Sequence, residues 1–581
     1  MKKKAEEDPP MAIHTIDTVI TSSMEKLFPD KAPAGLGERR LTCLKNEPLS
    51  FAVAYRLNSN QAFAVGTHIR IESELPISLY SVGYVPVLQT RDAALDDHFE
   101  PGLFGDLLLP KKTNPRVGRI SYPWEDIYLE EDDTRLFARS DSWQAVYLTV
   151  NEEEKCLAAG VYPVKLTFYT IKDDTPLGTC ETVVEVVGAR LPKQKLLYTN
   201  WFHCDCLCDA YGVAPFSERF WEIFATYVRA AAKNGMNTIL TPTFTPPLDT
   251  PVGKERMTVQ LVGVTCREGV YSFDFSLLEK FIEIATACGI THFEHTHLFT
   301  QWGALHAPKI MATVDGKYRR LFGWETVAAG KKYIGFLRAY LTALIAFLRE
   351  RGLDRNFIYH ISDEPSPAHH AAYLRAKAGI ADLLEGYTVC DALSHYEFYE
   401  DGTVTTPIVV TYCVKDFIGR VKNLWVYYTG GSAKGGMPNR KLNTTGERNR
   451  MLGVQMYMCD AKGFLHWGYN YWYGPLSQGF IDPRIDTGYF SGGSPGSAFL
   501  VYPATNGACI ESIRQKVFYE AVNDMRALQA LEKRIGKRAT RAFVEGFFGE
   551  VSFETHLGTA DRLLAFREAL AEKLKALSEG K

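Results

Sequence analysis

The sequence predicts a multidomain chain of α/β and β class, with an N-terminal β-sandwich, a (β/α)8 barrel of the TIM type and a helical C-terminal extension. Three observations predict this architecture. The 581 residues exceed one average domain. Short alternating runs dominate the first third, and apolar runs then alternate with helices or loops. The predicted boundaries are 12–190 for the sandwich, 196–507 for the barrel and 508–581 for the extension packed on it.

The first region is predicted to be built from short strands. Apolar and polar residues alternate there, as they do in half-buried strands, and turn-forming stretches such as VNEEEK and KDDTPLG separate the runs. Strands at this spacing are typical of a β-sandwich. The clearest runs are 62–72, 143–150, 162–170 and 180–188.

Eight strand-like runs follow, which is the number a closed (β/α)8 barrel needs. They cover 196–206, 237–244, 291–299, 357–365, 387–394, 406–412, 424–430 and 463–472. Phe220, Phe224 and Val228 share one face of the first predicted helix. Ser276 and Glu279 have the spacing of a capping box for the second. The helical spacing of apolar residues is weak over 395–445 and is clear again after 508.

Composition excludes several classes of protein. Lys+Arg total 65 and Asp+Glu 68, so the net charge of −3 offers no attraction to nucleic acid. No apolar run of 18 residues and no secretory h-region are present, and 12 cysteines are too dilute for a disulfide scaffold. We therefore expect a cytoplasmic chain with no membrane or nucleic-acid partner. Aromatic residues make up 12%, which favours stacking surfaces such as those that hold sugar rings.

The most informative motif is HISDEPSP (360–367), where Asp363 and Glu364 are adjacent at the end of a predicted strand. Active sites of (β/α)8 barrels lie at the strand C-termini. Side chains alternate along a strand, so both carboxylates can serve one ligand only if the strand stops there, and Pro365 favours such a break. The alternative is a capping cluster for the helix predicted to begin at Pro367.

Other strand ends carry polar and aromatic clusters. GFLHWGYNYW (463–472) mixes rings with His and Asn, which suits a sugar platform as well as a core. His295 and His297 are predicted on one strand face, where they can bind substrate or, with a third ligand, a metal. Cys204, Cys206 and Cys208 are predicted on one strand face as buried structural residues. The candidate substrate-binding residues are Trp201, His203, His295, His297, Tyr412, Trp467, Tyr469 and Trp472.

No Gly-rich phosphate loop and no G-x-S-x-G elbow occur, so the sequence supports neither a nucleotide cofactor nor serine hydrolysis. We predict that the site uses no cofactor and no metal. The oligomeric state is left open.

Five ordered motifs, TNWFHCDC, NTILTPTFTPPLDT, FEHTHLF, ISDEP and GFLHWGYNYW, resemble those of glycoside hydrolase family 123, the β-N-acetylgalactosaminidases. The stretch 500–532 is similar as well, so the resemblance covers about 195–535 behind a β-sandwich of the kind the family has. The resemblance implies that Asp363 and Glu364 are the catalytic residues. It also implies retention of configuration through assistance by the substrate's own acetamido group.

Adjacency of two acids suits that route. A conventional retaining glycosidase places carboxyls about 5–5.5 Å apart on opposite sides of the scissile bond, whereas neighbours on one chain approach from similar directions. We expect Glu364 to be the general acid and base, protonated at rest, and Asp363 to remain ionised and orient the acetamide N–H. The predicted function is the exo-release of terminal β-linked N-acetylgalactosamine from an oligosaccharide or glycoconjugate.

Two alternatives differ in chemistry. The same barrel can cleave a sugar without an acetamido group through two separated carboxylates. Alternatively, the aromatic platform can bind glycans without cleaving them.

Overall fold

The computed structural model describes residues 14–59, 62–88, 99–112, 135–432, 434–488, 494–555 and 557–579. The chain divides into two compact units where the sequence predicts three segments. Within the described ranges, every helix is too short or too polar to cross a membrane. Unit 1 comprises Met1–Tyr84, Leu103–Arg190 and Ala571–Lys581; unit 2 comprises Val85–Gly102 and Leu191–Leu570.

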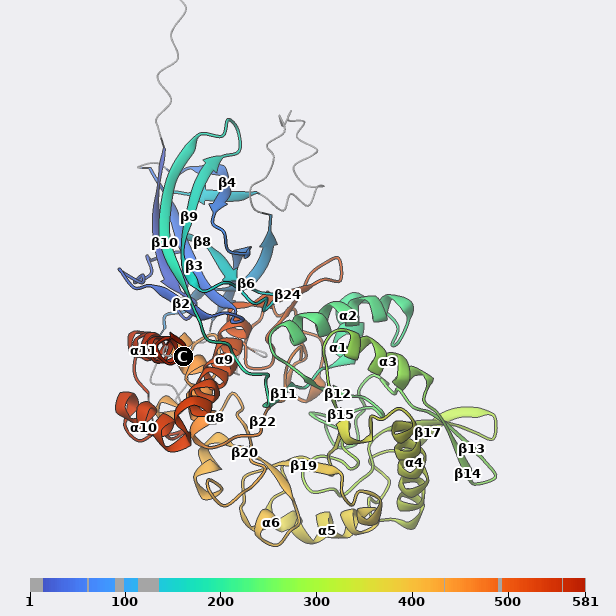
Figure 1. Cartoon of the computed structure of the whole chain (residues 1–581). Helices are drawn as coiled ribbons and strands as arrows, with labels where there is room; N and C mark the ends of the chain where they lie inside the picture. The colour runs from blue at the N-terminus through green and yellow to red at the C-terminus, as the bar shows by residue number, and fades with distance from the viewer. Residues whose placement is uncertain are drawn as a thin grey trace, which may run out of the picture. The chain divides into compact units, whose positions relative to one another are not determined.

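Unit 1 is rich in β-strands, which form two sheets (Figure 1). One sheet has the order β1 (Thr15–Ser22), β3 (Leu49–Asn58), β8 (Gln144–Val150), β5 (Ile77–Val87) and β6 (Gly102–Lys111). The other has the order β2 (Leu41–Leu44), β10 (Pro176–Val187), β9 (Gly160–Thr170), β4 (Ala64–Glu72) and β7 (Leu136–Arg139). Both sheets contribute to the core of unit 1: Phe51 and Val53 on β3 and Leu166 and Phe168 on β9 are fully buried. The four clearest predicted runs overlap β4, β8, β9 and β10, although β9 and β10 begin before the runs do.

Unit 2 contains a closed barrel of eight strands, as the eight apolar runs predict. Neighbouring strands are parallel, and β11 pairs with β22 to close the barrel. Each predicted run contains one strand. In order around the barrel they are β11 (Leu197–Asn200), β12 (Thr238–Thr241), β15 (His292–His295), β18 (Phe357–Tyr359), β19 (Thr388–Leu393), β20 (Thr406–Val410), β21 (Trp425–Tyr427) and β22 (Gly463–His466).

Long helices connect the first strands of the barrel, and Figure 1 shows α2, α3 and α4 beside it. These are α2 (Glu218–Lys233), α3 (Ser276–Ala287) and α4 (Lys331–Glu350), with α5 (His370–Ala378) after β18. The later connections are short: α6 (Glu397–Glu400), a 3-10 turn (Thr411–Asp416), α7 (Gly446–Arg450) and α8 (Leu452–Met458). Weak helical patterning over 395–445 therefore reflects short or irregular connections.

A small sheet that the sequence analysis does not predict is inserted in the loops after β12 and β15. Its order is β14 (Val270–Asp274), β13 (Gly263–Arg267), β16 (Ile310–Val314) and β17 (Lys317–Phe322). The β13–β14 hairpin extends away from the barrel strands in Figure 1.

The chain ends in helices. A short hairpin of β23 (Tyr502–Pro503) and β24 (Cys509–Ser512) precedes α9 (Ile513–Ile535), α10 (Lys537–Phe548) and α11 (Ala560–Glu579). α9 contacts α7 and α8, and it is almost entirely buried over its first four turns. Arg450 of α7 makes buried ion pairs of 2.9 Å with both Glu520 and Asp524 of α9.

Two local predictions are wrong. The cysteines of HCDCLCD lie on helix α1 (Cys204–Tyr211) and not on a strand, because β11 has already ended at Asn200. The three cysteines are two and four residues apart, and in so short a run these spacings fit the period of a strand as well as that of a helix. The predicted capping box is also absent: Ser276 is the first residue of α3, and Asp274 accepts hydrogen bonds from its backbone N–H and hydroxyl, at 2.9 and 2.5 Å. An acidic side chain just before the helix thus takes the capping role.

Candidate active site

A cavity of about 180 Å³ lies at the C-terminal ends of the barrel strands, where (β/α)8 enzymes carry their active sites. Seven of the eight strands, or the loops that follow them, contribute to it. The lining residues are Trp201, His203, Leu248, Asp249, Gln301, Trp302, Asp363, Glu364, Ala392, Tyr427, Thr429, Leu465 and Trp467.

Asp363 and Glu364, hereafter the acid pair, both reach this cavity. The strand β18 ends at Tyr359, but the chain stays attached to the segment after β15, since Trp302 N–H donates to the Asp363 carbonyl at 2.9 Å. Glu364 then adopts φ +42°. This left-handed conformation costs a non-glycine residue about 1–3 kcal/mol and is concentrated at functional sites. The turn at Glu364 explains how two consecutive side chains can face one cavity.

The electrostatics of the acid pair differ between its members. Burial, and then the charges of Glu364 and Asp391, raises the pKa of Asp363 well above its usual range. Glu364 Oε1 accepts a hydrogen bond of 2.5 Å from the Tyr427 hydroxyl. Burial raises the pKa of Tyr427 well above its usual value, so this phenol keeps its proton and acts as the donor. In the absence of substrate, burial and the neighbouring charges therefore favour the protonated form of Asp363, whereas the sequence predicts an ionised Asp363.

The floor of the cavity is apolar and the walls are aromatic. Leu248, Ala392 and Leu465 belong to the cluster that fills the barrel interior, together with the nearly buried Trp201. Trp201 Nε1 is buried and has no hydrogen-bond partner in the part of the chain that the structure describes. Trp302, by contrast, is 44% exposed. Such a surface offers ring faces and an apolar recess to the C–H groups of a sugar.

A third carboxylate, Asp249, lines the cavity from the loop after β12. Its backbone also lies in the left-handed region, with φ +43°. The Tyr471 hydroxyl donates to its carboxylate, and Ser477 Oγ donates to its carbonyl at 2.8 Å. The sequence analysis missed Asp249, Gln301, Trp302, Tyr427 and Thr429. Of these, Tyr427 and Thr429 lie in the predicted run LWVYYTG (424–430) and carry the strand-end signal that identified the other residues.

His203 lines the cavity as a fixed, neutral imidazole. Burial, and then the charge of Arg256, lowers the pKa of His203 to about 3. Its Nε2 lies 2.9 Å from the Trp467 carbonyl, so Nε2 donates, and Nδ1 accepts from Arg256 at 3.2 Å. Arg256 is in turn held by both oxygens of Asp205, at 2.9 and 3.0 Å. This chain of contacts fixes the backbone at Trp467.

The cavity brings together five of the ten predicted site residues: Trp201, His203, Asp363, Glu364 and Trp467. The other five are absent from its lining. His295 bonds to Thr243 and Tyr340, at 3.1 and 2.8 Å. Tyr469 and Trp472 are buried and donate to backbone carbonyls of Tyr227 and Val501. Tyr412 is 50% exposed in the turn after β20, and His297 stacks on His360.

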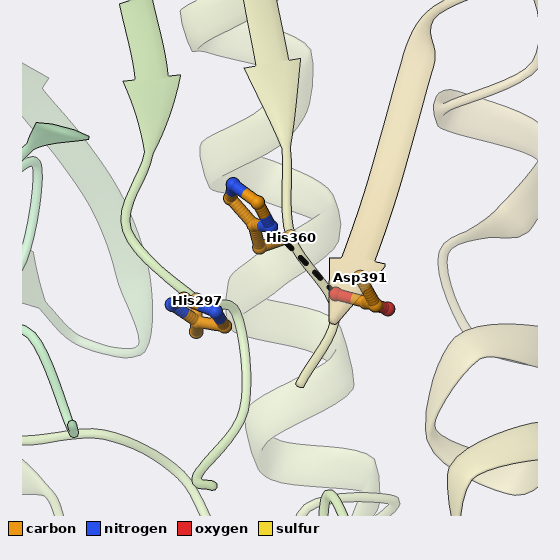
Figure 2. A group of neighbouring side chains, drawn as sticks. All are labelled: His297, His360 and Asp391. Carbon is orange, nitrogen blue, oxygen red and sulfur yellow. Dashed lines mark ion pairs between the residues drawn. The ribbon is translucent and has the colours of Figure 1, made fainter. Parts of the chain in front are cut away.

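His297, His360 and Asp391 form a group of neighbouring, buried side chains (Figure 2). Their donor atoms lie within 4.8 Å of one another, and two imidazoles with a carboxylate are a set that zinc accepts. The two rings, however, stack at 4.7 Å with only 22° between their planes. Imidazole binds a metal along its in-plane lone pair, so two nearly parallel rings do not aim at a common point. The donor types suit a metal, but the ring orientations do not.

The group is instead part of a hydrogen-bonded charge cluster. His360 lies between Glu294 Oε1, 3.2 Å from Nε2, and Asp391 Oδ1, 3.8 Å from Nδ1. Burial lowers the pKa of His360, but the hydrogen bond to Glu294 and the charges of Glu294 and Asp391 outweigh it and raise the pKa above its usual value. His297 stays neutral, since burial and then the charge of His360 lower its pKa well below the ordinary range.

Known proteins resemble this chain in sequence family and in fold. The model of the glycoside hydrolase 123 catalytic domain matches residues 201–531. A family 123 glycoside hydrolase from Clostridium perfringens, studied for glycolipid glycan hydrolysis, has a similar structure, with TM-score 0.69, 13% identity and coverage of 97% of this chain and 98% of that one. A Ruminococcus gnavus β-glucuronidase matches at TM-score 0.31 and 9% identity over 88% of this chain and 68% of its own. No curated protein sequence matches.

Proposed function

Because the chain belongs to glycoside hydrolase family 123, we propose that it is a retaining exo-glycosidase that releases terminal β-linked N-acetylgalactosamine. The supporting observation is that two consecutive carboxylates, at the end of one barrel strand, line the same small cavity. Family membership, which the five sequence motifs predict, identifies the substrates as glycans or glycoconjugates. We also propose that the sugar is N-acetylgalactosamine, that the reaction is assisted by the substrate, and that the barrel is of the (β/α)8 type.

The route begins with attack by the substrate. The acetamido carbonyl oxygen forms a bond to the anomeric carbon as the glycosidic C–O bond breaks, and Glu364 gives its proton to the leaving oxygen. An oxazoline-type ring results. Water then attacks the anomeric carbon, returns a proton to Glu364 and reopens the ring, so two inversions give net retention. The Asp363 carboxylate accepts a hydrogen bond from the acetamide N–H and balances the positive charge that develops on the nitrogen.

Substrate binding accounts for the position of the proton. The protein groups alone favour a protonated Asp363, but an acetamide N–H that donates to this carboxyl favours its ionised form. The proton then moves from Asp363 to Glu364, which donates it to the leaving oxygen. Tyr427 occupies Oε1 of Glu364, so Oε2 can carry the proton. A substrate without the acetamide has no N–H that favours the ionised form of Asp363, so the proton stays on Asp363. The apolar floor of Leu248, Ala392 and Leu465 suits the acetyl methyl group.

The test is hydrolysis of aryl β-glycosides of N-acetylgalactosamine, N-acetylglucosamine and galactose. We expect the wild type to cleave the galactosaminide fastest. Glu364→Gln should lower kcat by roughly 10²–10⁴-fold, the usual contribution of general acid catalysis. Asp363→Asn should lower kcat by roughly 10²–10³-fold, as loss of an electrostatic stabiliser does. A thiazoline mimic of the oxazoline should inhibit competitively. Turnover of the galactosaminide without thiazoline inhibition would exclude the assisted route.

Asp249 keeps the two-carboxylate alternative open, because it is a third acid in the cavity and comes from a different strand end. In that mechanism Asp249 forms a covalent bond to the sugar. The same panel separates the two routes. Equal rates on the galactoside and the galactosaminide, with Asp249→Asn inactive and a glycosyl adduct visible by mass spectrometry, would replace the assisted mechanism.

A further inference from the structure

The segment between β18 and the acid pair is held from both sides. On one side, Leu298 N–H donates to the His360 carbonyl and Phe299 N–H to the Ile361 carbonyl, each at 3.0 Å. On the other side the ladder between β18 and β19 has already ended, with Tyr359 opposite Val389. The N–H groups that follow therefore need acceptors other than the β19 backbone.

The side chain of Asp391 supplies that acceptor. One carboxylate oxygen, Oδ1, accepts from Ile361 N–H at 2.9 Å and from Ser362 N–H at 3.2 Å. Both donors directly precede Asp363. A single carboxylate thus fixes two consecutive peptide units next to the acid pair.

Asp391 is itself held in place. The Tyr373 hydroxyl of α5 donates to Oδ2. His360 faces Oδ1 on the other side, as Figure 2 shows, and Glu294 holds the far nitrogen of that imidazole. Thr199 of β11 donates to Glu294 at 2.6 Å, so the cluster links several barrel strands. Asp391, His360 and Glu294 are all fully buried. An isolated buried charge is costly, and the alternation of acid, imidazole and acid offsets that cost.

We propose that Asp391 is a positioning residue for the acid pair: it sets the path of Ile361 and Ser362 and thereby the direction in which Asp363 and Glu364 enter the cavity. The unusual φ of Glu364 supports this role, because a strained backbone persists only where its surroundings over-determine it. The inference rests on the proposed function of the acid pair.

The experiment compares Asp391→Ala and Asp391→Asn with the wild type on an aryl β-N-acetylgalactosaminide. The alanine variant leaves two buried N–H groups unpaired, and the freed segment misplaces the acids. We expect kcat to fall about 100-fold, the scale of a 1 Å misplacement, while KM changes less than about threefold. Asparagine retains an acceptor oxygen at the same reach, so it should recover most of kcat. The control is Leu393→Ala, a buried truncation on the same face of β19, which should lower the unfolding midpoint without lowering kcat more than a few-fold.

The outcomes distinguish a failure of the positioning role of Asp391 from a failure of the proposed function. If Glu364→Gln is inactive while Asp391→Ala retains wild-type kcat, the positioning role is wrong and the proposed function stands. If Glu364→Gln is fully active, the proposed function itself fails. If Asp391→Asn loses as much kcat as Asp391→Ala, the acceptor geometry is not what matters and the inference fails. Should the alanine variant not fold, Asp391→Ser replaces it, since serine is polar but too short to reach both N–H groups, and the same loss is expected.

Discussion

At the scale of single residues, the hydroxyl of Tyr427 is the contact that most directly affects the proposed acid. It donates to Glu364 at 2.5 Å from the end of β21. A hydrogen bond to a charged group contributes about 1.5–3 kcal/mol. Tyr427→Phe should therefore lower kcat/KM by roughly 10- to 100-fold. The basic limb of the pH–rate profile should move to higher pH, because a donor that favours the ionised carboxylate is lost.

The adjacent Tyr428 provides a matched control. It is also buried, but its hydroxyl has no hydrogen-bond partner in the described part of the chain. Tyr428→Phe makes the same chemical change and should leave kcat/KM and the pH profile unchanged. Equal effects of the two substitutions would show that loss of a phenol in this region, and not the contact with Glu364, is responsible.

The residues of the cavity differ in how visible they are in the sequence. Asp363 and Glu364 could be singled out because two acids interrupt an apolar run just where a strand must stop. Asp249 could not, because its place depends on the path of a long loop and on contacts with Tyr471 and Ser477, more than 220 residues later. Tyr469 and Trp472 were misplaced for a related reason. An aromatic residue at a strand end can stack on a sugar or fill the core, and backbone carbonyls of distant segments decide between these roles.

At the scale of secondary structure elements, α8 and α9 approach so closely that only glycine fits at Gly453. A Cβ there would lie 1.8 Å from the Ala521 carbonyl oxygen, well inside van der Waals contact. Gly453→Ala should therefore destabilise the fold by about 1–3 kcal/mol or more, although alanine is the better helix former. Chemical denaturation monitored by circular dichroism measures this difference.

Gly335, in the interior of α4, is the control for that substitution. A Cβ at this position meets no atom within 4 Å. Gly335→Ala should stabilise the protein by about 0.5–1 kcal/mol, since only helix propensity changes. If Gly453→Ala were stabilising as well, the close approach of α8 and α9 would be wrong.

The elements also show where periodicity is informative. Amphipathic runs long enough for two or more turns, such as that of α2, predict helices correctly. The run after β11 is too short: its cysteines at every second position suggest a strand, yet Cys204 and Cys208 also share a helical face, and the structure places them on α1. The inserted sheet of β13, β14, β16 and β17 was missed because its strands are short and lie in loops that were assigned no structure.

At the scale of the whole molecule, the closed barrel follows from the count of apolar runs, because eight parallel strands bury every run and leave no edge. The cavity then follows from the common direction of the strands. The number of runs does not predict the charge cluster of Glu294, His360 and Asp391. These residues come from three different strand regions, and each looks like an ordinary strand residue in the sequence.

That cluster makes the stability of the whole molecule depend on pH. Burial raises the pKa of Asp391 to about 7, although His360 and the donors to its oxygens lower it. In the unfolded chain an aspartate titrates near 3.9. The folded protein therefore binds this proton more tightly, so the stabilisation is complete below about pH 4 and is lost as the pH rises from about 4 to 7. The raised pKa of His360 acts in the same direction, whereas the lowered pKa of His203 opposes it.

The difference in unfolding free energy between wild type and Asp391→Asn isolates this contribution. We expect that difference, wild type minus variant, to fall as the pH rises from 4 to 7, with a slope of at most about 1.4 kcal/mol per pH unit, and to level off above pH 7. Asp382 is the control for the sign, because the hydrogen bond from Arg338 lowers the pKa of this exposed carboxyl. Asp382→Asn should have a small effect, and the wild-type advantage should vanish as the pH falls. A difference for Asp391→Asn that stays constant between pH 4 and 7 would show that Asp391 titrates alike in the folded and unfolded chains.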